Sequence, residues 1–181
     1  TNSYSSPSVA ENNPTTILVK VSHVAARLDF SQFDVTLNDF EGNPTVVFDE
    51  AKFVNLQQNG KIVEGDASVN VKDGAFLNRS NRIGTKWTDM GTAYGYANQY
   101  KQDSEMNTAL YVKFTVDGRT FEKTYPINPA GITKEVDHNG IKGGYLYDIK
   151  VRWTITPDWG DSTIEFYTRD WVHNSIPEIV L

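Results

Sequence analysis

Several absences narrow what this protein can be. The sequence has no cysteine, which excludes disulfides, cysteine-ligated zinc and a cysteine nucleophile together. It has no run of about 18 apolar residues, so we predict no membrane-spanning helix. Its 17 basic residues are outnumbered by 23 acidic ones, giving a net charge of −6. This balance argues against binding to nucleic acid or to anionic membranes, both of which favour a basic surface.

Catalytic and metal-binding motifs are also missing. The sequence contains no HExxH, P-loop, GxSxG or dinucleotide-binding pattern. None of its three histidines lies four residues from another: His23, His138 and His173. We therefore predict no catalytic residue, no metal site and no cofactor, and we predict that the chain is not an enzyme. A site assembled from residues far apart in the sequence remains the alternative.

Two acidic pairs resemble parts of functional sites. Asp158 and Asp161 in "DWGDS" form half of a calcium loop but lack the remaining oxygen ligands, so we interpret the segment as a turn. Asp49 and Glu50 are adjacent on a predicted strand, where neighbouring side chains point to opposite faces. Such a pair is unsuited to shared acid–base chemistry.

Alternation of apolar and polar residues dominates what is present. The chain is 39% hydrophobic, which is enough for a core, and helical periodicity of any length is absent. Ile17, Val19 and Val21 begin the pattern, and 24–37 continue it. In "VAARLDFSQFDVTL" the apolar positions change parity after Phe30. We therefore expect a bulge near Ser31–Gln32, because a regular strand would turn half of these side chains outward.

Further strands follow along the chain. We predict strands in 45–58, 109–127 and 145–155, with 163–172 pairing back on the last of these. Asp117–Gly118 and Asn59–Gly60 are typical of tight hairpin turns. Residues 78–107 fit no template, and we interpret them as loop with one or two short strands, or a short helix near Tyr94 to Met106. The predicted fold class is an all-β, antiparallel β-sandwich of transthyretin-like or Greek-key type, with a long irregular connection in the middle.

Three regions differ in composition. Residues 1–16 are rich in Ser, Asn and Pro and are expected to form a flexible arm or linker. Residues 17–170 are predicted to form the β-sandwich domain, and residues 171–181 a C-terminal strand. The sequence begins at Thr1 without a Met and without a secretory signal. We expect that it is a mature, processed or trimmed form from which targeting information has been removed.

The irregular middle is rich in aromatic residues. An exposed aromatic platform there would suit contact with a glycan; the alternative is a lid of rings packed onto the sandwich. The candidate glycan contacts are Trp87, Tyr94, Tyr96 and Tyr100.

The end of the chain, "TRDWVHNSIPEIVL", is unusually apolar for a free terminus. Burial of four of its aliphatic side chains would contribute about 6–12 kcal/mol before ordering costs. Pro177 suits an edge position because it has no N–H to donate. The segment is either the last edge strand of its own domain or a donor strand that completes another molecule. Its candidate subunit-contacting residues are Trp171, Val172, Ile176, Ile179, Val180 and Leu181.

Both ends of the predicted domain resemble the fimbrillins of Bacteroidetes, the subunits of type V pili. In "ILVKVSHVAARLDFSQFDV" the matching residues are Val21, His23, Val24, Ala26, Arg27, Leu28 and Phe30. "FDEAKFVNLQQNGKIV" is similar to the next strand of that family. Near the end, Tyr147 to Val151 match its "Y-x-I-x-apolar" strand, and Trp171 is followed by ten residues. The chain differs from the family in "KGGYL" before that strand and in its short "TPDWGDS" loop.

The resemblance covers the C-terminal half of a fimbrillin, and implies that an N-terminal β domain is absent from this sequence. It implies a lipoprotein precursor that is exported, and a protease that removes one strand. The groove left behind, largely in the N-terminal domain, then accepts the C-terminal strand of a neighbouring subunit. Under this resemblance the chain holds the donor strand and is a structural subunit of a fimbrium outside the cell, attached to the outer membrane.

Two functions remain open at this stage. The first is a fimbrial subunit that polymerises by donor-strand exchange and supports adhesion, with other fimbrial subunits as partners. The second is a surface carbohydrate-binding β-sandwich, or a tip adhesin that combines both roles. Host or bacterial surface ligands are the expected partners in that case. Neither function involves nucleic acid or a membrane span in this chain.

Overall fold

The computed structural model describes residues 24–60, 70–78, 82–99, 105–129 and 140–170. All of them fall within one compact unit, His23–Trp171. The predicted arm at 1–16, the alternating Ile17, Val19 and Val21, and the predicted strand at 171–181 lie outside the described residues. The three histidines also lie outside them.

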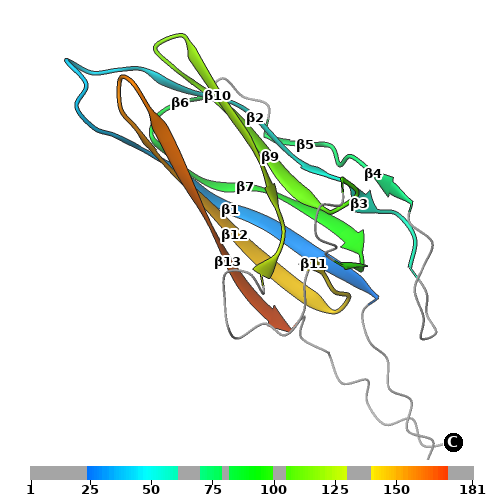
Figure 1. The fold of residues 1–181 in the computed structure, drawn as a ribbon. Helices are drawn as coiled ribbons and strands as arrows, with labels where there is room; N and C mark the ends of the chain where they lie inside the picture. Colours follow the sequence, from blue (N-terminus) through cyan, green and yellow to red (C-terminus); the bar gives the residue numbers. More distant parts are fainter. Residues whose placement is uncertain (1–23, 61–69, 79–81, 100–104, 130–139, 171–181) are drawn as a thin grey trace, which may run out of the picture. The chain divides into compact units, whose positions relative to one another are not determined.

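Two large β-sheets make up most of the described fold (Figure 1). The first sheet has the order β13 (Gly160–Asp170), β12 (Tyr145–Ile155), β1 (Ala25–Leu37), β7 (Lys86–Tyr96). The second has the order β10 (Arg119–Pro126), β9 (Ala109–Val116), β2 (Val46–Val54), β5 (Phe76–Asn78), and β6 (Arg82–Ile83) also pairs with β2. Two short pairs complete the set: β11 (Gly140–Ile141) with β8 (Asn98–Gln99), and β3 (Leu56–Gln57) with β4 (Val71–Lys72). The prediction of an all-β sandwich is confirmed.

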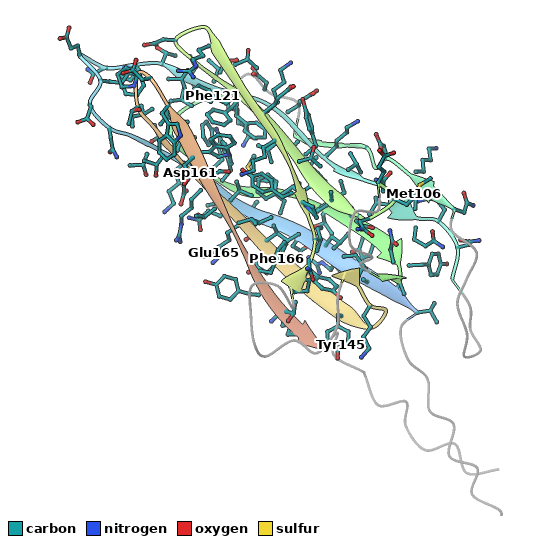
Figure 2. All side chains as sticks on the ribbon, viewed as in Figure 1. Met106, Phe121, Tyr145, Asp161, Glu165 and Phe166 are labelled. Carbon is teal, nitrogen blue, oxygen red and sulfur yellow. The ribbon has the colours of Figure 1, made fainter. Side chains whose placement is uncertain are left out.

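The core lies between the two sheets and is rich in aromatic rings. Phe33 of β1, fully buried, has its ring centroid 5.3 Å from those of Phe48 in β2, Trp87 in β7 and Phe114 in β9. Phe114 also stacks on Phe121 of β10, which Figure 2 labels among the rings between the layers. Because these contacts join strands of both sheets, the ring cluster fixes how the layers pack.

Strand β1 contains the predicted bulge. Its pairing shifts between Phe30 and Gln32 against both neighbours, β12 and β7. Phe30 and Phe33 are both fully buried, so the extra residue keeps the two halves of the strand facing the core.

One neighbour of β1 pairs with it in parallel, whereas the sequence predicts antiparallel pairing. β12 is antiparallel to β13 but parallel to β1, with Leu28 opposite Tyr147 and Val35 opposite Trp153. The sequence predicts β12 only as an antiparallel strand, because its alternation does not reveal the direction of a distant partner.

One of the two predicted hairpin turns is confirmed. Asp117 and Gly118 join β9 to β10 with φ values of 45° and 82°, and two positive φ values are what a two-residue turn of this kind requires. The prediction for Asn59–Gly60 is wrong. Neither residue has a positive φ, and the preceding strand β3 pairs with Val71–Lys72, beyond residues 61–69.

The middle of the chain is more regular than predicted. Strand β7 runs for 11 residues through the segment interpreted as loop, and Tyr94 lies in it instead of in a helix. Its alternation is hidden because the strand is bulged: Asp89 and Gly91 have φ values of 53° and 141°. Gly91 is required there, since a Cβ would lie 3.0 Å from Leu77 of β5.

Candidate functional site

The predicted donor residues follow the last described strand directly. Strand β13 ends at Asp170, and Trp171 to Leu181 lie outside the described residues. β13 is an edge strand of the first sheet, with β12 on its one paired side. The segment predicted to leave the domain therefore continues from a sheet edge.

The four candidate glycan contacts do not share one environment. Trp87 is only 5% exposed, and its ring packs against Phe33 and Phe48 in the core. Tyr94 is 56% exposed, and Tyr96 is half-buried with its ring close to Gly60. Tyr100 lies outside the described residues. Trp87 therefore belongs to the core, whereas Tyr94 is on the surface of the same strand.

The outer face of the first sheet carries mostly polar side chains, which the strand register arranges in rows. In one row Tyr94, Arg27, Leu146 and Arg169 lie side by side across β7, β1, β12 and β13. The next row holds Thr92, Asp29, Asp148 and Tyr167, and the third Thr88, Gln32, Lys150 and Glu165. The face is polar because alternation in β1 and β12 sends their apolar residues into the core.

A groove of about 500 Å³ follows these rows. Its lining comes from all four strands and includes the bulge residue Ser31 and the β7 bulge at Asp89 and Gly91. Such a volume lies within the range of about 300–1,000 Å³ typical of small-molecule sites. This groove is a concave polar site among the described residues, and the predicted aromatic segment does not form it.

Two of the six charged side chains that line the groove pair with each other. Arg27 Nε donates to Asp29 Oδ1 at 2.9 Å, and Thr92 Oγ1 donates to the same oxygen at 2.7 Å. The hydrogen bond to Asp29 raises the pKa of Arg27 above its ordinary value. Beside the groove, Arg152 Nη1 donates to Glu165 Oε1 at 2.6 Å.

Asp148 lines the groove from β12. Its Oδ1 atom is buried and accepts no hydrogen bond from any described residue. A buried carboxylate oxygen without a donor costs free energy. Asp148 lies directly opposite Asp29 in the parallel pair, and opposite Tyr167 on the other side.

Tyr167 forms the wall of the groove on β13. Its ring is 54% exposed, and Lys150 Nζ lies 4.8 Å from the ring centroid. Its hydroxyl donates to Glu165 Oε2 at 3.2 Å. These contacts hold an aromatic face at the surface beside Asp148.

The acidic pairs singled out from the sequence are structural. Asp161 Oδ1 accepts from the backbone N–H of Ser162 at 2.7 Å, at the start of β13 and directly after the turn. The prediction that Asp49 and Glu50 point to opposite faces is wrong. A register shift between Phe48 and Glu50 leaves both carboxylates outside the core.

The outer face of the second sheet places these carboxylates near a tyrosine. Burial and a hydrogen bond to Glu122, with the charges of Glu50 and Asp49, raise the pKa of Tyr111 to about 12. Thr115 Oγ1 donates to Asp49 at 2.8 Å. Across the described ranges no three His, Asp or Glu side chains gather as metal ligands, and no helix is long and apolar enough to cross a membrane.

Comparison with known proteins identifies the fold. No protein-family model and no curated protein matches the chain. Among solved structures, a candidate cell adhesion protein from Parabacteroides distasonis matches with a TM-score of 0.62 and 20% identity, over 83% of this chain and 52% of that protein. A C-terminally truncated form of the tip fimbrial protein Mfa3 from Porphyromonas gingivalis matches with a TM-score of 0.45 and 13% identity, over 83% and 52%.

A candidate cell adhesion protein from Bacteroides eggerthii matches with a TM-score of 0.47 and 15% identity, over 83% of this chain and 56% of that protein. By their descriptions, these similar structures are one fimbrial protein and two candidate cell adhesion proteins. The chain spans about half the length of these proteins. With the Parabacteroides distasonis protein, at 20% identity, it shares a fold.

Proposed function

We propose that the chain is the C-terminal half of a fimbrial subunit that supports adhesion at the bacterial cell surface. The observation that carries this proposal is the likeness of its fold to a candidate cell adhesion protein, with a TM-score of 0.62 over 83% of the chain. The sequence resemblance to fimbrillins at both ends of the domain points the same way. The subunit lies in a fimbrium attached to the outer membrane, with other fimbrial subunits as its partners.

Assembly proceeds by donor-strand exchange through residues 171–181. An extended segment that joins another sheet gains main-chain hydrogen bonds and pockets for alternate side chains. Ile176, Ile179 and Leu181 supply apolar anchors for such pockets. Residues 17–170 form the sandwich and residues 1–16 the linker that precedes it.

The test uses the full-length protein that contains this chain, produced together with its processing protease. Deletion of 173–181 is expected to leave a folded monomer that forms no filaments in electron micrographs and no ladder on unboiled denaturing gels. The double variant Ile176→Asp with Ile179→Asp is expected to behave like the deletion variant. Glu178→Gln serves as the matched control and should polymerise normally. If the deletion variant unfolds, the tail belongs to its own core; if it polymerises normally, donor exchange through this tail is wrong.

A further inference from the structure

Strand β13 is an edge strand without the features that usually protect such strands. It runs for 11 residues, Gly160–Asp170, in unbroken register with β12, and it contains no proline and no lysine. Among the described residues, no strand pairs with its other side (Figure 1). A long, regular edge presents a row of unpaired N–H and C=O groups that can pair with another chain.

The other edges of the two large sheets are better protected. β7 is bulged, and its Gly91 packs so closely on Leu77 of β5 that a Cβ would lie 3.0 Å from that side chain. β10 has 8 residues, contains Lys123 and ends at Pro126. β5 and β6 have 3 and 2 residues. Because short length, bulges, proline and lysine all discourage edge pairing, β13 is the described edge most open to a partner strand.

The sequence of β13 is complementary to itself. When two copies of the strand pair antiparallel around a two-fold axis, one register gives all 11 residues a partner, and it places Glu165 opposite its own copy. That register places Asp161 opposite Arg169 of the second copy, and the symmetry repeats the contact at the other end. Directly opposed residues of opposite charge stabilise a strand pair. Any other register leaves strand residues unpaired and separates these two charges.

The same register suits the centre of the strand. Phe166 is buried, and Ile164 is partly buried against the core, so both face the inner side of the first sheet. Each Ile164 then lies opposite Phe166 of the other copy, which continues the apolar inner face across the axis. The like-charged pair is Glu165 with its own copy. Each of these carboxylates already accepts a hydrogen bond from Arg152 Nη1 at 2.6 Å, which offsets their repulsion (Figure 2 labels Glu165 and Phe166).

We infer that β13 pairs with β13 of a second copy of this chain and joins the two first sheets into one. The strand order across this dimer is β7-β1-β12-β13, followed by the same strands in reverse. The inference rests on the proposed function in one respect, because residues 171–181 have to leave β13 free, as a donor segment does. Unlike donor-strand exchange, this contact is symmetric, so it links two copies and then stops.

Sedimentation velocity on the 181-residue chain, from about 1 µM to 1 mM, tests the inference. We expect a monomer–dimer equilibrium with a dissociation constant of about 100 µM or tighter. Asp161→Arg and Arg169→Asp are each expected to weaken dimerisation about tenfold or more, because each variant places like charges opposite one another at both ends of the strand pair. An equimolar mixture of the two variants restores opposite charges at both ends, and should dimerise about as well as the parent.

The controls separate pairing from folding. Asp161 and Arg169 are both exposed, so each substitution should leave the melting temperature unchanged. Arg82→Asp is the matched charge reversal at an exposed position of another edge strand, β6, and should dimerise as the parent does.

A crosslink tests the register. The chain has no cysteine, so Glu165→Cys introduces one thiol that lies opposite its own copy in the proposed dimer. Cβ atoms of directly opposed residues lie about 4.5–5.5 Å apart, which a small adjustment brings within disulfide range. Thr163→Cys places its thiol opposite Tyr167 and away from its own copy. Under mild oxidation, Glu165→Cys should therefore form linked dimers about tenfold faster than Thr163→Cys.

The inference is overturned if the chain stays monomeric at about 1 mM, if the single charge variants dimerise like the parent, or if the two cysteine variants crosslink equally fast. The double variant Ile176→Asp with Ile179→Asp separates this failure from failure of the proposed function. If the chain is monomeric and this variant dimerises, residues 171–181 cover β13 in their own domain, and both ideas are wrong. If both are monomeric while the full-length protein forms filaments, the inference alone is wrong.

Discussion

Deleting Ser31 tests whether the bulge in β1 preserves the inward-facing pattern of the strand. Against β12, Phe30 pairs with Ile149 and Gln32 with the adjacent Lys150, so Ser31 is the surplus residue. Its removal makes the alternation regular and keeps Phe30 and Phe33 on one face. The loss comprises the Ser31 Oγ hydrogen bond to the Ile149 carbonyl, at 3.3 Å, and local adjustment of β7. We expect the free energy of unfolding to fall by no more than about 2 kcal/mol.

Deleting Asp34 in the same strand is the matched comparison. This deletion makes Phe33 and Val35 adjacent, so either Val35 and Leu37 turn outward or Phe33 does. Exposing two aliphatic side chains costs about 3–6 kcal/mol, at about 1.5–3 kcal/mol each. Urea unfolding followed by tryptophan fluorescence measures both losses, and Ser31→Ala separates the hydrogen bond from the bulge. Equal losses for the two deletions, or a larger loss for Ser31, would refute this interpretation of the bulge.

Three further predictions concern the core and its tyrosines. Phe33→Ala should lower the free energy of unfolding, measured in urea, by about 3–5 kcal/mol, whereas Tyr94→Ala, at an exposed position, should change it by no more than about 0.5 kcal/mol. Similar losses for the two variants would contradict the ring cluster as the centre of packing. Tyr147→Phe removes the oxygen that accepts a hydrogen bond from the Lys142 N–H at 2.8 Å. The variant should lower the free energy of unfolding by about 1–3 kcal/mol and speed hydrogen exchange of that amide, and unchanged exchange would argue against the contact. Burial raises the pKa of Tyr125 to about 12, so it stays neutral in the fold while the unfolded chain ionises near pH 10. The contribution of Tyr125 to stability should therefore be full below pH 10 and fall by about 1.4 kcal/mol per pH unit between pH 10 and 12. The raised pKa of Tyr111 adds to the same loss, so Tyr125→Phe should lessen the slope by about that amount without abolishing it; an unchanged slope would count against this origin.

Local chemistry explains which parts of the fold the sequence predicts. The bulge in β1 is visible because the parity of apolar residues changes around it, and the Asp117–Gly118 turn because two adjacent residues determine it. Strand β7 is missed because positive φ values at Asp89 and Gly91 interrupt its alternation. The parallel pairing of β1 with β12 is missed because no local pattern specifies a partner so distant in the sequence.

The sequence likewise predicts the part of the candidate site that local patterns determine, and misses the part that depends on strand pairing. The sequence identifies one polar face of β12, which carries Asp148 and Lys150, from alternation alone. It does not show that Asp29 and Tyr167 flank Asp148, because those neighbours depend on the register of β12 with β1 and β13. The burial of Trp87 and the exposure of Tyr94 were likewise hidden, since the β7 bulge separates them.

The position of the apolar C-terminal segment in the assembled fimbria tests the proposed function most directly. A cryo-EM reconstruction of native filaments, at a resolution that traces side chains, would locate Ile176, Ile179 and Leu181. Donor-strand exchange predicts that these residues form a strand hydrogen-bonded into a sheet of the adjacent subunit. Finding them paired within their own domain, with no segment passing between subunits, would contradict it.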